Sequence, residues 1–588
     1  MSTWRGSRIA YVSLALAVVL IGGFNVAGTV NAIAGNSDAD SGKVDTINIP
    51  VSIPINLPQG YTTLGISSQV AFVHSGTLGL VPTTSPDGSS TLFSFSMSNG
   101  QIAGSADLTA DFGVSSSWGS AVQNPLEYLQ SFDGSGLVAV YGQDGAGDQT
   151  VVMFECSQEG ALSRLWAQSF PAPPSPSSTP AVQFNADGSK LYTYYTVTKA
   201  ASGDAGAEGP LGGSGLTQET TRRFPLLVFN GEARGLRPSV VVEIVASYIV
   251  LIDSADGSVA DTFQVPTTPL DSGPVHGLVF DVQSDRLVAL VGASIYVFQD
   301  IADQVRLAAK ITPAADVVGV AWPIGVVGGR FLASFGGGPM VGDYFFCTDL
   351  DAGPTTSLFI PGNREPYANL VSLDQPDNSI LVPYSLILST HADDLDIING
   401  TPRCDLLSIS ANGALVRSSR TVLPPGSTSA PNVFRLGDNA TASRSGAMCF
   451  LAAWSGNMFT ADAETGDVVN QMSLAPSPLQ YLALDSATDQ IVFGAGTSMG
   501  IFEAPDHPTI SSVDVKDSQT TIEGASFLSG ATVTINGVSA PIVGTSPTHF
   551  GREIIVGLGK ANLPKGQHFA VVVTNRDGLS SNSFSFER

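Results

Sequence analysis

The densest group of side chains able to do chemistry in this 588-residue sequence lies at residues 391–396. His391 is followed by Asp393, Asp394 and Asp396. An imidazole and three carboxylates could hold a divalent cation such as calcium if the loop folds back on itself. The run lacks the Asp-x-Asp-x-Asp-Gly order of a calcium loop. We therefore interpret it as a solvated acidic loop, with a metal site as the alternative; the sequence predicts no other cofactor.

Catalytic groups are otherwise sparse. The chain has six histidines, and it has no Gly-x-Ser-x-Gly elbow to supply the nucleophile of a catalytic triad. An enzyme would instead need carboxylates that converge on a common channel and hold a divalent ion. The candidates are Asp133, Asp281, Asp393, Asp394 and Asp485. The sequence favours a non-catalytic protein, and a lactonase, another hydrolase or a lyase is the alternative.

A repeat along residues 44–505 must position these side chains. Each copy has an apolar strand, a turn rich in Asp, Gly and Ser, a very apolar strand, a third strand and a fourth that ends in Pro; the clearest copy begins at His276 and ends at Pro313. A period of about 40 to 50 residues with four strands per unit is the signature of a β-propeller. The sequence therefore predicts an all-β propeller of seven or eight blades.

The last copy of the repeat supplies only three strands before the chain leaves at Pro505. We predict that residues 44–58, which end in Pro58, add the missing outer strand and close the ring. The style of the repeat resembles that of bacterial propellers of the YVTN and quinoprotein-like kind. A resemblance of that sort implies a fold and little about function.

Residues 507–588 form a separate all-β module of sandwich size. Apolar alternation at residues 520–522 and 532–535 is cut by the turn Asn536-Gly537 and resumes at 553–556 and 569–574. Two prolines stiffen the short linker at residues 504–508, which predicts restricted motion between the module and the propeller.

Four segments of this module, residues 508–510, 522–527, 531–537 and 573–582, closely resemble the IPT/TIG family. The resemblance implies an immunoglobulin-like β-sandwich, which in that family is usually a spacer or adhesive module of extracellular proteins. It names no activity.

The amino terminus has the pattern of an export signal. Arg5 and Arg8 precede an apolar run at residues 9–21, and Ala32 and Ala34 provide the small residues that a signal peptidase requires. We predict a cleaved secretory signal peptide at residues 1–34. An uncleaved anchor is the alternative, although the run is short for a membrane span. The mature chain is therefore expected to be secreted or at the cell surface, without a membrane span.

Composition narrows the class of partner. The formal net charge is −25, from 51 acidic and 26 basic residues, so binding to nucleic acid is not expected. We expect an extracellular protein or polysaccharide as partner, with self-association as a further possibility. The chain contains four cysteines, Cys156, Cys347, Cys404 and Cys449. They allow up to two disulfides in an oxidising compartment, or four buried thiols within strands.

Overall fold

The computed structural model describes residues 52–588 except for residues 64–69, 113–115, 119–120, 124–125, 133–134, 145, 147, 171–181, 201–241, 267–274, 292–293, 301–302, 313–320, 328, 337–342, 352, 354, 361–370, 373–378, 386–401, 411–412, 423–439, 453–455, 476–478, 480, 486, 496 and 546–552. All described residues lie in one compact unit, Ile47–Arg588. The predicted signal peptide at residues 1–34 lies outside them. No helix within the described ranges is long and apolar enough to cross a membrane.

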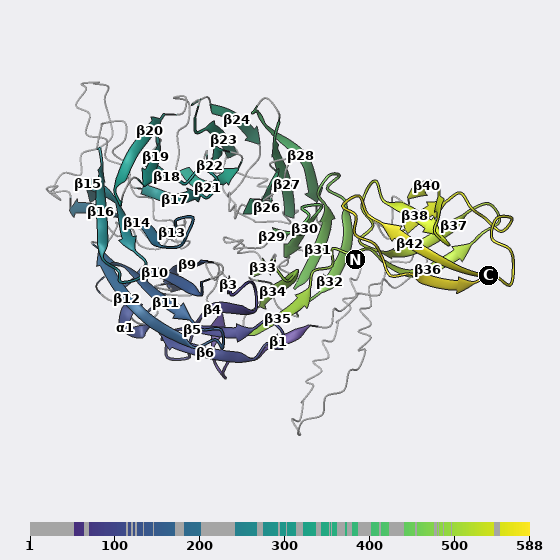
Figure 1. Cartoon of the computed structure of the whole chain (residues 1–588), viewed down its shortest axis with the longest axis horizontal. Helices are drawn as coiled ribbons and strands as arrows, with labels where there is room; N and C mark the ends of the chain where they lie inside the picture. Colours follow the sequence, from purple (N-terminus) through teal and green to yellow (C-terminus); the bar gives the residue numbers. More distant parts are fainter. Residues whose placement is uncertain are drawn as a thin grey trace, which may run out of the picture. The chain divides into compact units, whose positions relative to one another are not determined.

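Antiparallel β-sheets built mostly of four strands make up the first part of the chain (Figure 1). In the described residues there are eight such sheets. Their strands and the short elements beside them are β1 (Ile53–Ile55); β2 (Thr62–Thr63), β3 (Ala71–Val73), β4 (Leu78–Thr84), β5 (Ser90–Ser96), β6 (Ile102–Asp107); α1 (Thr109–Phe112), β7 (Ser116–Trp118), β8 (Ala121–Gln123); β9 (Leu126–Phe132), β10 (Leu137–Gln143), β11 (Gln149–Cys156), β12 (Leu162–Phe170); β13 (Val182–Phe184), β14 (Lys190–Ala200), β15 (Val242–Asp253), β16 (Val259–Val265); β17 (Val275–Asp281), β18 (Arg286–Val291), β19 (Ser294–Asp300), β20 (Val305–Ile311); β21 (Ala321–Val327), β22 (Arg330–Gly336), β23 (Asp343–Asp349), β24 (Thr355–Ile360); β25 (Val371–Ser372), β26 (Ser379–Ser385), β27 (Pro402–Ile409), β28 (Leu415–Val422); β29 (Ala440–Ala442), β30 (Met448–Ala452), β31 (Asn457–Asp462), β32 (Val468–Ser473); β33 (Tyr481–Asp485), β34 (Gln490–Ala495) and β35 (Ser498–Glu503).

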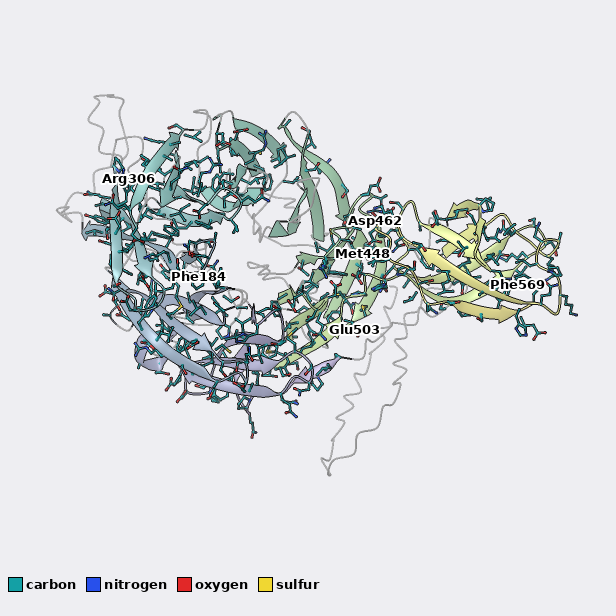
Figure 2. All side chains as sticks on the ribbon, viewed as in Figure 1. Phe184, Arg306, Met448, Asp462, Glu503 and Phe569 are labelled. Carbon is teal, nitrogen blue, oxygen red and sulfur yellow. The ribbon has the colours of Figure 1, made fainter. Side chains whose placement is uncertain are left out.

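Burial explains why the middle strands are so apolar. Nearly every residue of β10 and β18 is buried, because neighbouring sheets cover both faces of these strands. The outer strands β6 and β20 face solvent. Apart from Val305, all their residues are half-buried or exposed. Figure 2 shows side chains between neighbouring sheets, for example around Phe184. The innermost strands β3, β9, β13, β17, β21, β25, β29 and β33 contact one another in that order. This arrangement is that of a β-propeller.

The amino-terminal strand β1 is the outermost strand of the last sheet, whose order is β1-β35-β34-β33. Ile53 pairs with Ile501, and Ile55 pairs with Met499. The Ile55 side chain is buried in a cluster that contains Val81 of the first sheet and Ile501 of the last. The outer strand was expected within residues 44–58; residues 44–51 lie outside the described residues, and β1 at Ile53–Ile55 occupies this position. One short strand therefore joins the two ends of the repeat.

Two further sheets follow the propeller, and we call them the C-terminal sheet pair. Their orders are β36-β37-β41-β40 and β39-β38-β42-β43. The strands are β36 (Thr509–Val515), β37 (Thr520–Ala525), β38 (Thr532–Ile535), β39 (Val538–Ala540), β40 (Ile542–Thr545), β41 (Glu553–Val556), β42 (His568–Thr574) and β43 (Phe584–Glu587). Both sheets contribute to one apolar core that includes Ile522 and Phe569; Phe569 is labelled in Figure 2. Asn536 and Gly537 have φ values of 51° and 77°, which form the predicted tight turn between β38 and β39.

Two of the cysteines test the expectations above. Cys156 and Cys449 are buried free thiols, so two disulfides that together use all four cysteines are excluded. Burial raises the pKa of Cys156 to about 11. Burial, together with the negative charge of Asp462, raises the pKa of Cys449 to about 12. Both side chains are core residues of strands that sequence periodicity already marked as apolar.

Candidate functional site

The predicted metal ligands His391, Asp393, Asp394 and Asp396 lie outside the described residues. Within the part of the chain that the structure describes, no group of three or more His, Cys, Asp or Glu side chains could hold a metal ion.

Of the predicted channel carboxylates, Asp133, Asp393 and Asp394 lie outside the described residues. Asp281 and Asp485 are described, and each has a local structural role. Asp281 ends β17 and accepts hydrogen bonds from the Gln283 amide, at 3.2 Å, and from the Ser284 hydroxyl. Asp485 ends β33 and accepts them from the Ala487 amide, at 3.2 Å, and from Thr488. Both carboxylates therefore brace the turn that follows an innermost strand, and they belong to two different sheets.

Asp485 also fixes the contact between the last sheet and the first. A Cβ atom on Gly76, whose φ is +77°, would lie 1.7 Å from Asp485 Oδ2. The turn between β3 and β4 thus packs directly on this carboxylate. Asp485 therefore takes part in packing between the last blade and the first.

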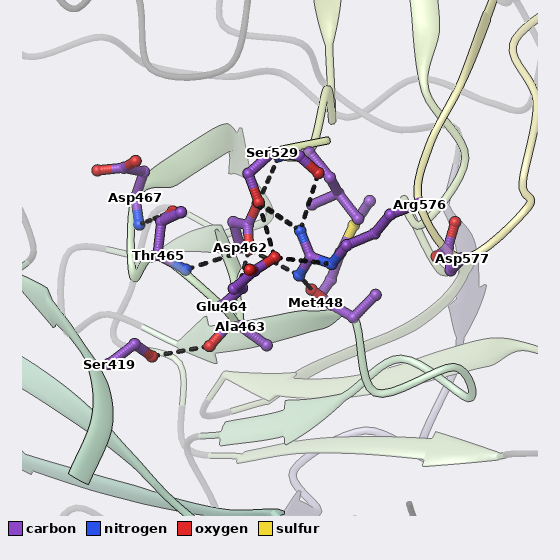
Figure 3. A network of polar contacts seen from close by, with 12 residues as sticks. Ser419, Met448, Asp462, Ala463, Glu464, Thr465, Asp467, Ser529, Arg576 and Asp577 are labelled. Atoms are coloured by element: carbon purple, nitrogen blue, oxygen red, sulfur yellow. Dashed lines mark hydrogen bonds and ion pairs between the residues drawn. The ribbon is translucent and has the colours of Figure 1, made fainter. Parts of the chain in front are cut away.

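The most elaborate polar site among the described residues joins the propeller to the C-terminal sheet pair (Figure 3). Asp462 ends β31, and its side chain is only 1% exposed. Arg576, which follows β42, binds it with both terminal nitrogens: Nη2 lies 2.7 Å from Oδ1 and Nη1 lies 2.8 Å from Oδ2. A two-pronged pair of this kind fixes both distance and orientation. We call it the Asp462–Arg576 junction.

Backbone groups and the Glu464 carboxylate make further contacts with the two charged side chains. The amides of Ser529 and Glu464 donate to the Asp462 carboxylate at 2.7 and 2.8 Å. Arg576 Nη2 donates to the carbonyl of Ala447 at 3.2 Å, and its Nε lies 3.4 Å from the Glu464 carboxylate. The buried carboxylate is therefore fully engaged, which is the condition for a buried ion pair to be tolerated.

The ionisation of the pair follows from these contacts. Burial opposes the charge on Asp462, but the hydrogen bonds from Arg576 and from the Ser529 and Glu464 amides outweigh it, so the pKa of Asp462 is lowered. Burial likewise opposes the charge on Arg576, and Asp462 overcomes it and raises the pKa of Arg576. A lowered carboxyl pKa gives stability that is present above the unfolded value, about 3.9, and is lost as pH falls through the folded value.

Apolar packing accompanies the ion pair. Leu528 of the C-terminal sheet pair is buried in the core cluster formed by the last two blades. Next to it, the Ser526 amide donates to the Val469 carbonyl at 3.3 Å, and the Ser526 hydroxyl donates to the Pro505 carbonyl at 2.9 Å. Asn575 accepts from the Leu528 amide and donates to the Ser526 carbonyl. The loop at residues 526–529 is thus shaped to enter the propeller.

A second buried carboxylate, that of Asp506, lies near the junction in surroundings that oppose its negative charge. Asp506 lies in the linker, and its side chain is 4% exposed. Burial raises the pKa of Asp506, the negative charge of Asp489 raises it further, and His507, at 3.8 Å, partly opposes the effect. Because the folded pKa is above the unfolded value, this group stabilises the fold at low pH, and that contribution is lost as pH rises.

We therefore expect Asp506→Asn to stabilise the protein at pH 7 by roughly 1 kcal/mol, since it removes a buried charge and keeps the shape of the side chain. The gain should vanish below about pH 3.9, where the wild-type carboxyl is protonated in both states. Thermal unfolding midpoints measured across pH check this. Asp514→Asn, whose carboxylate is 67% exposed, is the control and should show no gain. A lower midpoint for Asp506→Asn at pH 7 would contradict the prediction.

Sequence reasoning did not find the Asp462–Arg576 junction. Asp462 and Arg576 are 114 residues apart in the sequence. Neither residue lies in a local motif that predicts its partner.

These sheets and their junction define a β-propeller that carries a second all-β unit. The chain is similar in structure to the Dos1 propeller, with a TM-score of 0.47 and 10% identity over 77% of this chain and 95% of that one. It is similar to the C-terminal WD40 domain of Sif2, with a TM-score of 0.42 and 11% identity over 78% and 99%. It is also similar to BamB from Moraxella catarrhalis, with a TM-score of 0.40 and 10% identity over 76% and 97%. The likeness is one of fold and carries no function to this chain.

No family model matches the sequence, and no curated protein matches it significantly.

Proposed function

We propose that this is an exported, non-catalytic binding or scaffold protein. The propeller binds an extracellular protein or polysaccharide, and the C-terminal sheet pair, an immunoglobulin-like domain of the IPT/TIG kind, is its spacer or docking module. The Asp462–Arg576 junction carries the proposal. A spacer can hold the propeller in a fixed orientation only if the two are rigidly attached. A buried ion pair whose hydrogen bonds are all made, together with the inserted loop at residues 526–529, favours such attachment.

Charge supports this class of partner. The formal net charge of −25 disfavours anionic polymers such as nucleic acid at ordinary salt. Neutral polysaccharides and proteins with neutral or basic surfaces remain compatible with it.

The test uses the purified chain without residues 1–34. It is titrated onto immobilised extracellular polysaccharides and surface proteins at physiological salt, and we expect saturable binding to one of them. Arg576→Ala should bind with the affinity of the propeller alone. It should lose the fixed orientation of the C-terminal sheet pair relative to the propeller, and small-angle scattering should then report a broader distribution of domain separations. Binding that never saturates on any surface would overturn the binding function. Unchanged scattering of Arg576→Ala would overturn the role of the junction.

Metal content separates this function from a metal-dependent enzyme. Elemental mass spectrometry of the same preparation should find no stoichiometric divalent ion, and chelation should leave the unfolding midpoint unchanged. Near-stoichiometric calcium, together with a lower midpoint after chelation, would favour the enzyme and make residues 391–396 the first to mutate.

A further inference from the structure

Three aromatic side chains stack on one another where the second and third sheets of the propeller meet. The ring centroids of Phe170, at the end of β12, and Tyr195, on β14, lie 5.3 Å apart, with 10° between the ring planes. Tyr195 in turn lies 4.8 Å from Tyr248 on β15, with 18° between the planes. We call these residues the aromatic stack. Phe170 is buried and the two tyrosines are half-buried, so Tyr248 is the end of the stack that solvent reaches.

Glutamine amides lie beside the stack. Gln264 on β16 pairs directly with Tyr248, so the two side chains project from the same face of the sheet, and Gln264 is exposed. Gln168 is two positions before Phe170 on β12, lies on the same face as Phe170 and is half-buried. An amide side chain both donates and accepts hydrogen bonds. The stack is therefore flanked by uncharged groups that can bind hydroxyls.

A third amide at this end of the second sheet has an unpaired acceptor. Gln149 begins β11, pairs directly with Phe170 and is fully buried. Its side-chain nitrogen donates to the Tyr141 hydroxyl, and its side-chain oxygen has no hydrogen-bond partner among the described residues. Buried acceptors are nearly always paired. An unpaired acceptor next to the aromatic stack favours a ligand that brings hydrogen-bond donors.

Ring spacing and charge disfavour two other classes of ligand that bind aromatic side chains. Proline-rich peptides dock in grooves between separated rings, and a ring held between two others needs about 7 Å, twice a van der Waals contact. The centroids in the stack are only 4.8 and 5.3 Å apart, so no ring fits between them. Nucleic-acid bases also stack on aromatic side chains, but a formal net charge of −25 repels their phosphates.

We propose that the aromatic stack and the glutamines beside it bind a neutral sugar of an extracellular polysaccharide. One face of a pyranose ring carries C–H groups, which pack on the Tyr248 ring, and its rim carries hydroxyls, which bind Gln264 and Gln168. The three aromatic and three amide side chains carry no charge, so no ion is left unpaired when the sugar excludes water. The inference rests on the proposed function and gives it a ligand class and a site.

The probes are four neutral hexasaccharides: maltohexaose, cellohexaose, laminarihexaose and mannohexaose. Each is titrated calorimetrically into the chain without residues 1–34. We expect saturable binding of at least one, with a dissociation constant on the order of 0.1 to 1 mM. Hexagalacturonate, an acidic probe of the same length, should not bind, because the chain is strongly acidic. Binding of none of the four neutral probes, or equal binding of hexagalacturonate, would overturn the proposal.

Substitutions assign the site. Tyr248→Ala should raise the dissociation constant at least about tenfold, because the ring on which the sugar packs is lost. Tyr248→Phe keeps the ring and should stay within about threefold of the wild type. Gln264→Leu replaces an exposed side chain, so the fold is retained, and it should weaken binding about three- to tenfold. Wild-type affinity in both Tyr248→Ala and Gln264→Leu would overturn the site.

Tyr61→Ala is the matched control. Tyr61 is also half-buried and packs on an aromatic ring, that of Phe93, with the centroids 5.2 Å apart, but it belongs to the cluster that joins the first and last sheets. We expect it to leave the affinity unchanged. Equal weakening by Tyr61→Ala would show that loss of any such tyrosine disturbs binding, and would contradict the assignment.

Chemical modification gives a readout that does not depend on substitution. Tetranitromethane nitrates accessible tyrosines, and mass spectrometry reports each position. The bound hexasaccharide should reduce nitration of Tyr248 and leave that of Tyr61 unchanged; equal nitration of Tyr248 with and without the sugar would contradict the proposal. Saturable binding to a surface protein, with no binding of any hexasaccharide, would overturn this inference and leave the proposed binding function standing.

Discussion

Arg576→Ala is expected to release the C-terminal sheet pair from the propeller at neutral pH. The substitution leaves the Asp462 carboxylate, 1% exposed, buried and without its counter-ion. Loss of one partner from a buried pair costs about 3 to 5 kcal/mol. Leu528, the Ser526 contacts and the hydrogen bonds of Ser529 and Ser445 then hold the junction without the ion pair. Thermal unfolding should separate into two transitions, and small-angle scattering should require several domain separations.

The control for this experiment is an ion pair of the same kind on the surface. Lys560 lies 2.8 Å from Asp517, with side chains 50% and 92% exposed. Exposed pairs contribute little because water screens them. Lys560→Ala should therefore shift stability by no more than about 0.5 kcal/mol and leave the scattering curve unchanged. If Arg576→Ala behaves like Lys560→Ala, the ion pair does not hold the junction.

Much of the propeller could be predicted because its signals are local. Strand alternation and turn residues recur within each repeat, and most propeller sheets pair strands that are consecutive in the chain. The Asn536-Gly537 turn was predictable for the same reason, since a two-residue hairpin requires positive φ at both positions.

The roles of the inner carboxylates were harder to predict, although a signal was present. Asp281 and Asp485 are each followed three positions later by a hydroxyl residue, Ser284 and Thr488. That spacing is typical of a carboxylate that binds the turn after its own strand. Residue type alone suggested ligands for a metal, whereas the spacing indicated a turn.

The junction could not be predicted, because it depends on packing between distant segments. Asp462 and Arg576 meet only once the seventh sheet and the C-terminal sheet pair are formed. Apolar alternation identifies a strand without saying whether it lies at an edge.

Closure of the propeller by β1 gives the second large expected effect. The strand has only three residues, yet it is held from both sides: Ile55 is 3% exposed, and a Cβ atom on Gly100 of the first sheet would lie 2.3 Å from the Pro54 carbonyl oxygen. Removal of buried methyl groups costs both transfer free energy and the cavity that remains. We expect Ile55→Ala to destabilise the propeller by about 2 to 5 kcal/mol.

Partial loss of β1 also exposes the edge of β35, whose unpaired backbone groups can recruit another chain. Ile55→Ala should therefore lower the unfolding midpoint, increase proteolysis before residue 60 and promote aggregation on mild heating. Val282→Ala is the control, because Val282 is 66% exposed and its truncation should stay within about 0.5 kcal/mol. A variant at Ile55 that unfolds and aggregates like the wild type would show that contacts between the first and last sheets close the ring without β1.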